Sequence, residues 1–148
     1  MNTIKYTTND LIDHDAIAAV IKNDQGEILM QKHVKYGFWT IPVGKVKQGQ
    51  SVEDGLKQEV NEECNIVVED CEEIAHDDRV YERDGKMVNV LLHLFLIKKY
   101  SGGLKNNEPQ KHRKQEFLEI EAVKRLPYLS DSTILYLKSI GIERMAKL

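Results

Sequence analysis

The sequence predicts a mixed fold of the α/β (α+β) class, in which strands surround one central helix and a second helix closes the chain. Two observations support this prediction. Short runs rich in Val, Ile and Leu, typical of buried strands, flank a segment whose apolar residues recur at helical spacing. No internal repeat, low-complexity tract or flexible linker interrupts the 148 residues. We therefore expect a single domain over residues 1–148.

The first elements are predicted to be short strands. Residues 16–21 form an apolar run typical of a buried strand, and the turn-forming residues Asn-Asp-Gln-Gly follow at positions 23–26. We expect residues 27–30 to return as the second arm of a hairpin. Residues 38–41 read as another short strand, which Pro42 ends because proline has no backbone N–H to donate.

The central helix is predicted to follow Ser51. Ser51, with Asp54 three positions later, resembles a capping box, which starts a helix. Apolar side chains at every fourth position from residue 52 to residue 60 then form a helical stripe. Asn65 suits the end of the helix, because Asn is the residue other than Gly that most readily adopts the left-handed conformation there.

The second half of the chain is predicted to contain a long central strand over residues 87–97, where most residues are apolar. Asp84-Gly85 before it is a hairpin turn signal, and a further strand begins at residues 66–68. Residues 101–103 are expected to end the long strand, and residues 104–114 to form a polar basic loop. A short strand over residues 117–120 and a helix over residues 133–140, between Ser130 and Gly141, complete the chain.

Composition excludes several classes of protein. The net charge of −3 gives no general attraction to nucleic acid or to an anionic membrane, and no apolar run approaches the ~20 residues of a membrane span. The N-terminus lacks the basic-then-apolar plan of a signal peptide, and Cys64 and Cys71 are too few for a disulfide framework. We expect a cytoplasmic protein without stable nucleic-acid or membrane binding, and we leave a homodimer open.

Three carboxylates crowd one side of the predicted central helix. At 100° per residue, with Glu59 at zero, Glu63 lies at about 40° and Glu62 at about −60°, so all three fall within an arc of roughly 100°. The apolar stripe covers roughly 20° to 100° on the same scale, which places the carboxylates at the rim of the buried face. A solvated acidic stripe is the simpler interpretation of such a pattern. Carboxylates this close repel one another unless a cation lies among them, which favours a divalent metal site.

The loop before this helix supports the metal interpretation. Gly44 and Gly49 allow the backbone to approach a ligand closely. Lys45 and Lys47 add positive charge beside a helix N-terminus, which itself favours anions. A cation site next to an anion-binding loop is suited to phosphate chemistry.

Residues 44–66 resemble the Nudix box, whose pattern is G-x5-E-x7-R-E-U-x-E-E-x-G-U with U aliphatic. The residues that match the pattern in register are Gly44, Glu59, Val60, Glu62, Glu63 and Ile66. Three flanking segments also resemble the family: residues 14–30 its opening hairpin, residues 38–42 its W-x-x-P segment, and residues 107–112 a loop of MutT-like members. The resemblance spans roughly residues 14–127 and implies a Nudix-type α/β/α sandwich around a mixed sheet.

The resemblance also implies an activity, which is the hydrolysis of a nucleoside diphosphate linked to another group, with Mg²⁺ or Mn²⁺ as cofactor. By position, Glu62 and Glu63 correspond to metal ligands. Glu59 corresponds to a ligand or to the group that orients or deprotonates the attacking water. The carbonyl of Gly44 is a further candidate ligand.

Four residues are candidates for contact with a nucleotide substrate. Lys32 matches a basic position of the family that often meets phosphate, and Lys45 lies in the loop before the helix. Trp39 could stack on a base, although a lone Trp in a strand is more often part of a core. Tyr81 lies near the position where members that act on dinucleoside polyphosphates carry a Tyr, although a surface Tyr of a hairpin is the simpler interpretation.

The box is degenerate at three positions: Gln50 replaces its first Glu, Gln58 replaces its Arg, and Asn65 replaces its late Gly. In the family the Glu and the Arg form an ion pair that braces the loop against the helix. We expect Gln50 and Gln58 to form a neutral amide pair instead, because losing both charges together leaves no orphan charge. Val43, in place of the glycine before Gly44, is expected to stiffen the loop.

One further carboxylate often comes from the loop before the last strand in this family. Glu108 and Glu116 are available, but Gln110 or Lys111 occupies the aligned position, which argues against a catalytic base there. Two functions therefore follow. The first is metal-dependent hydrolysis of a pyrophosphate bond in a nucleoside di- or triphosphate, or in a nucleoside diphosphate linked to another group. The alternative is a catalytically weak Nudix-fold module that binds or senses a nucleotide.

Overall fold

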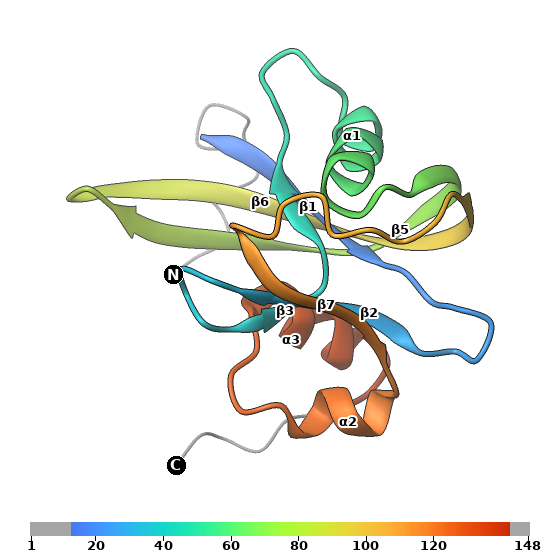
Figure 1. The fold of residues 1–148 in the computed structure, drawn as a ribbon. Helices are drawn as coiled ribbons and strands as arrows, with labels where there is room; N and C mark the ends of the chain where they lie inside the picture. Colours follow the sequence, from blue (N-terminus) through green and yellow to red (C-terminus); the bar gives the residue numbers. More distant parts are fainter. Residues whose placement is uncertain (1–12, 143–148) are drawn as a thin grey trace.

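The computed structural model describes residues 13–142 (Figure 1). Residues 1–12, to which the expectation about a signal peptide applies, and residues 143–148 lie outside the described part. The described residues form seven strands and three helices. The strands lie between α1 (Val52–Cys64) on one side and α2 (Ile120–Arg125) with α3 (Asp131–Ser139) on the other (Figure 1). This layering confirms the predicted α/β/α arrangement.

The strands form two sheets. The four-stranded sheet is mixed, because its two central strands run parallel to each other while its edge strands pair antiparallel. Its order is β4 (Val43–Lys45), β1 (His14–Val20), β6 (Lys86–Ser101) and β5 (Val67–Arg83). The three-stranded sheet is antiparallel, in the order β3 (Trp39–Thr40), β2 (Ile28–His33) and β7 (His112–Leu118).

The turn at residues 23–26 is present, and the N–H of Asn23 donates to the carbonyl of Glu27 at 3.0 Å. The hairpin predicted around it is wrong beyond the bridge between Lys22 and Ile28. Both edges of β1 are already taken by β4 and β6, so β2 leaves this sheet and pairs with β3 and β7. The turn therefore carries the chain from one sheet to the other.

Two apolar clusters hold the layers together. Under α1, Leu56 packs with Ile17 of β1. The next residue of β1, Ala18, faces the opposite side, where it packs with Leu94 of β6 and Leu137 of α3. This alternation follows from the two-residue period of a strand. It explains why β1 and the middle of β6 read as continuous apolar runs, since both faces of these strands are covered.

The ends of α1 confirm two predictions. The Ser51 Oγ accepts a hydrogen bond from the backbone N–H of Asp54 at 3.1 Å, so Ser51 is the N-cap. Asn65 ends the helix in the left-handed conformation, with φ 62°. Because both ends are fixed, the glutamates of the helix are held at a defined height above the four-stranded sheet.

The later elements differ from the prediction in extent. Asp84 and Gly85 form the expected turn, both with positive φ, but β5 runs for 17 residues where only its start was predicted. As an edge strand with many charged side chains, β5 lacks the apolar signal of a central strand. β7 begins inside the predicted loop, and Ile120 opens the unpredicted helix α2 instead of ending a strand.

Candidate active site

Glu59 and Gly44 lie against each other where α1 passes β4. A methyl group built on Gly44 would lie 2.6 Å from Cδ and from Cγ of Glu59, which no real side chain tolerates. The φ angle of Gly44 is not positive, so its backbone does not require glycine. A side chain at position 44 would therefore displace the Glu59 carboxylate from its place.

Glu63 is the buried carboxylate of the site, with 1% of its surface exposed. Its Oε1 accepts a hydrogen bond from Nε2 of Gln31 on β2, at 3.3 Å. Its Oε2 is buried and has no hydrogen-bond donor. Burial raises the pKa of Glu63 to about 8, and the hydrogen bond from Gln31 opposes this shift. At neutral pH the metal-free side chain therefore tends to hold a proton.

Glu59 and Glu62 differ in their surroundings. Burial, followed by the charge of Glu62, raises the pKa of Glu59, while the charge of Lys111 lowers it. Glu62 is exposed, and its Oε2 accepts a hydrogen bond from Nε2 of Gln58 at 2.8 Å. The structure thus pairs Glu59 with Glu63, and turns Glu62 toward Gln58.

A divalent cation fits the Glu59–Glu63 pair. Two half-buried or buried carboxylates in contact repel unless a proton or a cation lies between them, and the orphaned Oε2 of Glu63 lacks a positive partner. Within residues 13–142, however, no three His, Cys, Asp or Glu side chains converge in a ready-made metal site. Glu62 would have to leave Gln58 in order to join the pair as a third protein ligand.

The two glutamines of the degenerate box form the amide pair that the sequence predicts. Nε2 of Gln50 donates to Oε1 of Gln58 at 2.5 Å, and Oε1 of Gln50 accepts from the backbone N–H of Lys47 at 3.0 Å. With the bond from Gln58 to Glu62, this forms a continuous chain from the loop to the helix. The loop is braced without any formal charge on its bracing residues.

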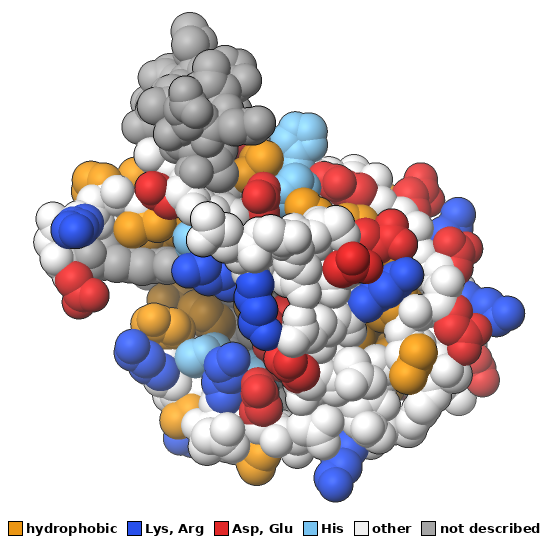
Figure 2. Space-filling view, turned by 90° about the horizontal axis from the view of Figure 1, so that it is seen from above, with side chains coloured by type: hydrophobic (Ala, Val, Ile, Leu, Met, Phe, Trp, Pro, Cys, Tyr) orange, Lys and Arg blue, Asp and Glu red, His pale blue; other side chains and the backbone are white. Residues whose placement is uncertain are grey.

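A cleft of about 460 Å³ opens beside β4, where Glu59 lies against Gly44. Its wall includes Gly44 and Lys45 of β4, so it reaches the residues against which Glu59 lies. Apolar and aromatic side chains line its interior, and hydroxyl and carboxylate groups lie at one end. Figure 2 shows this face hollowed, with hydrophobic side chains in the floor and Lys or Arg side chains along the rim. The side chains that give it this character include Tyr36, Phe38, Val43, Tyr81, Leu92, Ser130, Asp131 and Ser132.

The four predicted substrate contacts divide into two groups. Lys45 and Tyr81 line the cleft, and the Tyr81 hydroxyl donates to Oδ2 of Asp131 at 3.1 Å. Trp39 is 8% exposed and belongs to the core between the sheet and α3. Lys32 places its Nζ 5.7 Å from the centre of the Trp39 ring, and neither residue lines the cleft.

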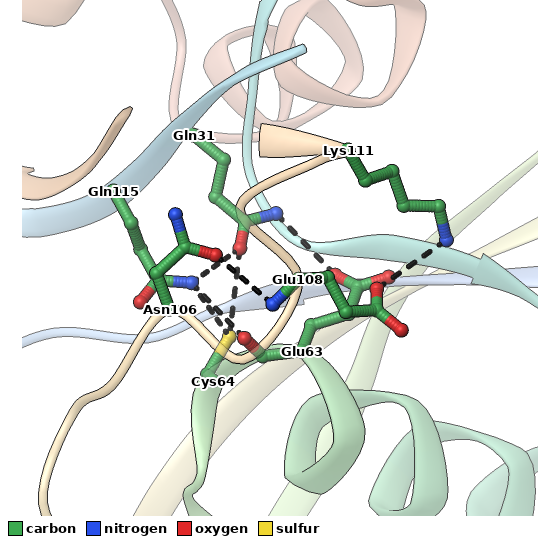
Figure 3. Close-up of polar contacts among 7 residues, drawn as sticks. All are labelled: Gln31, Glu63, Cys64, Asn106, Glu108, Lys111 and Gln115. Atoms are coloured by element: carbon green, nitrogen blue, oxygen red, sulfur yellow. Dashed lines mark hydrogen bonds and ion pairs between the residues drawn. The ribbon is translucent and has the colours of Figure 1, made fainter. Parts of the chain in front are cut away.

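The loop before β7 brings two charges to the glutamates. Glu108 raises and Lys111 lowers the pKa of both Glu59 and Glu63. The Nζ of Lys111 lies 3.5 Å from Oε1 of Glu108 (Figure 3). Of the loop residues weighed from the sequence, Lys111 and Glu108 thus lie near the helix carboxylates. Gln110 lines a neighbouring hollow that Glu108 and Lys111 share.

Several residues of the site carry no signal in the sequence. Gln31 follows three buried apolar residues in β2, so nothing in the pattern distinguishes it as a partner of Glu63. Asp131 follows the N-cap Ser130 and reads only as a residue of the first helical turn. Its place on the cleft depends on the packing of α3 beside β5, which no local pattern predicts.

This fold and site have known relatives. Residues 13–136 match the NUDIX domain family. The solved structure of a MutT NUDIX hydrolase from Burkholderia pseudomallei superposes with a TM-score of 0.73 and 26% identity, over 86% of this chain and 98% of that one. The chain belongs to the Nudix family, and its fold is that of the MutT structures.

Two curated relatives match shorter stretches of sequence. The 8-oxo-dGDP phosphatase NUDT18 of Danio rerio is 37% identical over 62 residues, which are 40% of this chain and 18% of that protein. The RNA pyrophosphohydrolase of Pseudomonas putida is 29% identical over 69 residues, 44% of this chain and 43% of that protein. The chain thus spans less than half of the length of these two relatives.

Proposed function

We propose that the protein hydrolyses a pyrophosphate bond in a nucleoside di- or triphosphate, or in a nucleoside diphosphate linked to another group, with Mg²⁺ or Mn²⁺ as cofactor. The observation that carries the proposal is the neighbouring carboxylates Glu59 and Glu63, of which Glu59 lies against Gly44 in the wall of an aromatic cleft. One relative is named as an 8-oxo-dGDP phosphatase and another as an RNA pyrophosphohydrolase, and both names describe reactions at phosphate groups.

The roles of the residues follow from their positions. Glu59, Glu63 and, after it leaves Gln58, Glu62 would hold the cation, together with the carbonyl of Gly44. The bound cation neutralises the phosphate charges and lowers the pKa of a coordinated water. In the alternative role that the family resemblance allows, Glu59 would not be a ligand and would instead orient the attacking water or accept its proton.

The cleft would hold the nucleoside. Tyr36, Phe38 and Tyr81 offer faces for a base, while Asp131 offers acceptor oxygens for an amino or imino group. Lys45 lines this cleft next to Gly44, where it would meet a phosphate. When the water attacks one phosphorus, the P–O bond to the bridging oxygen breaks and its electron pair stays on that oxygen, which leaves as part of the other phosphate group. Trp39 and Lys32 do not line the cleft. They would contact the nucleotide only if the β2–β3 region changed its conformation.

Metal-dependent turnover of a nucleotide panel tests the proposal. Phosphate or pyrophosphate release would be followed for nucleoside di- and triphosphates and for nucleoside diphosphate conjugates, each with Mg²⁺ and with Mn²⁺. We expect wild type to turn over at least one substrate and the Glu62→Gln, Glu63→Gln double variant to lose at least 100-fold in kcat/KM. Glu53→Gln, an exposed glutamate of the same helix paired with Lys57, is the matched control.

A second function, nucleotide binding with little turnover, has one observation in its favour. The brace between Gln50 and Gln58 is neutral, so the loop lacks the ion pair that the family resemblance implies. Micromolar nucleotide binding, with wild type no faster than the double variant, would establish this function and overturn the enzymatic proposal.

None of the helices within residues 13–142 is long and apolar enough to span a membrane. Cys64 and Cys71 are both free thiols, as expected in a reducing compartment. We propose that the protein acts in the cytoplasm on a small nucleotide and does not bind nucleic acid stably; a homodimer stays a prediction from the sequence.

A further inference from the structure

Two buried amides join the three-stranded sheet to the buried carboxylate of α1 (Figure 3). Gln31 of β2 is 0% exposed, and Gln115 of β7 is its direct cross-strand partner in the sheet. Their side chains point toward the end of α1, where Glu63 and Cys64 lie (Figure 3). A fully buried amide that follows three buried apolar residues is costly unless its hydrogen bonds are made. The position of Gln31 therefore needs an explanation.

The hydrogen bonds of the two amides have a fixed direction. Nε2 of Gln115 donates to Oε1 of Gln31 at 2.7 Å, and it also reaches the Glu63 carbonyl at 3.3 Å. This occupies the oxygen of Gln31 and leaves its NH₂ group facing the Glu63 carboxylate, to which it donates at 3.3 Å. The orientation of Gln31 is thus set mainly by Gln115, with a weaker contact from Sγ of Cys64 at 3.7 Å. In this orientation Gln31 presents a donor to Glu63.

The pattern of satisfied and unsatisfied atoms shows what the two amides favour. Gln115 leaves its own Oε1 buried without a partner, while its NH₂ group serves acceptors near Glu63. Glu63 is held through Oε1 only, and its Oε2 has no donor. The amides therefore fix one carboxylate oxygen and leave the other free to bind a ligand beside Glu59.

We propose that Gln31 is a positioning residue that holds the Glu63 carboxylate ready for a divalent cation, and that Gln115 sets the orientation of Gln31. The inference rests on the proposed function, because it assigns Glu63 to the cation. A purely structural interpretation treats the amides as a cross-brace between β2, β7 and α1. In that case their loss would lower the stability of the fold without a specific effect on cation affinity.

The two interpretations predict different rank orders among variants. Gln31→Met removes the donor at nearly constant side-chain length. Gln115→Glu cannot donate to Oε1 of Gln31, so Gln31 must turn its NH₂ toward the new carboxylate and present its oxygen to Glu63. Gln115→Met removes the donor without this reversal and lets Gln31 keep its NH₂ on Glu63. Gln25→Met, at an exposed turn position, is the matched control.

The Mn²⁺ dissociation constant of the full chain without nucleotide, measured by the EPR signal of free Mn²⁺, is the first readout. We expect it to rise about 10–100-fold in Gln31→Met and in Gln115→Glu, less in Gln115→Met, and not at all in Gln25→Met. Thermal unfolding in EDTA, measured on the same four variants, is the second readout. Gln115→Met loses a buried hydrogen bond as Gln115→Glu does, so a structural brace would give these two variants the same Mn²⁺ affinity.

Each outcome decides the inference. The inference is supported if the Mn²⁺ affinities of the variants fall in the predicted order and this order differs from the order of their melting temperatures. A folded Gln31→Met with the wild-type dissociation constant overturns it while leaving the proposed function intact. If Gln31→Met fails to fold, equal affinities of Gln115→Glu and Gln115→Met overturn it, and a weaker Gln115→Glu supports it. Wild type that neither binds Mn²⁺ nor hydrolyses any nucleotide overturns the proposed function and the inference together.

Discussion

The carboxylate of Glu59 occupies the space that a side chain on Gly44 would fill, with Cδ of Glu59 only 2.6 Å from the position of that missing Cβ. This contact joins β4, the last strand before α1, to one of the acidic residues of α1. It gives Gly44 a steric reason to be glycine, separate from any need for an unusual backbone angle. It also makes the position of the Glu59 carboxylate sensitive to one methyl group.

The substitution Gly44→Ala should therefore displace Glu59 from the site. We expect kcat/KM to fall about 10–100-fold, because a misplacement of about 1 Å has effects of that size, and we expect Mn²⁺ affinity to weaken as well. Gly103→Ala is the matched control, since no atom lies within 4 Å of the added methyl group. Equal activity of the two alanine variants would show that Glu59 has no fixed role.

The amide chain from Gln50 through Gln58 to Glu62 predicts a non-additive pair of substitutions. Gln50→Glu alone removes the Nε2 donor to Oε1 of Gln58 and places a carboxylate against that oxygen. We expect a loss of about 1 kcal/mol in the free energy of unfolding. Adding Gln58→Arg supplies donors for both carboxylates and should restore the free energy of unfolding to about its wild-type value.

Urea unfolding in EDTA of wild type, both single variants and the double variant measures this coupling. Additive effects would mean that the hydrogen bond between Gln50 and Gln58 does not brace the loop. The turnover of the double variant answers a separate question, which is whether the charged brace of the family makes a faster enzyme than the neutral one.

The sequence predicts the local parts of this molecule well. Ser51 and Asn65 mark the ends of α1 because caps act through backbone groups within a few residues. The three glutamates and the Gln50–Gln58 pair are likewise close neighbours on one helix and its loop. The hairpin expected after β1 is wrong because the competing partners of β1, namely β4 and β6, come from later in the chain.

The same limit applies to the site. Glu62 and Glu63 are adjacent in the sequence, yet one is exposed and the other is 1% exposed, because only Glu63 faces β2 and β7. Gln31 reaches Glu63 from 32 residues away, and Asp131 reaches Tyr81 from 50 residues away. Pairings at such separations depend on how the sheets and α3 pack, which no periodicity of a single segment encodes.

The raised pKa of Glu63 predicts how the stability of the metal-free protein depends on pH. The folded state holds a proton on this carboxyl up to a pH of about 8, whereas the unfolded chain releases it near the ordinary value of about 4.3. Between these values the folded state binds more protons, so the free energy of unfolding falls as pH rises, by at most about 1.4 kcal/mol per pH unit. Below this window the contribution of Glu63 is fully present.

Glu63→Gln should remove that slope, because the amide does not titrate. Urea unfolding from pH 5 to pH 8 in EDTA, on wild type and on this variant, measures the difference. Cation binding must displace the same proton, so Mn²⁺ titrations of wild type at pH 7 should release protons to the buffer, and titrations of Glu63→Gln should release fewer. Parallel pH profiles of the two proteins would rule out Glu63 as the titrating group.

Asp131 predicts the selectivity of the cleft. Its Oδ2 accepts from the Tyr81 hydroxyl at 3.1 Å, and it lines the cleft beside Ser130 and Ser132. If the cleft holds the base, the carboxylate of Asp131 can only accept hydrogen bonds from it, whereas Asn at this position can also donate. Asp131→Asn should therefore change the ranking of bases in kcat/KM, by about tenfold or more between bases that differ in their donor groups.

The variant Tyr81→Phe separates recognition from support. It removes the hydrogen bond to Asp131 but leaves the carboxylate and the aromatic face in place, so it should lower kcat/KM by a similar factor for every base. Both variants would be compared on the four common nucleoside triphosphates, with thermal unfolding as a check on α3, whose first turn contains Asp131. A uniform loss in Asp131→Asn as well would place base recognition elsewhere in the cleft, since a group that reads the base must affect different bases differently.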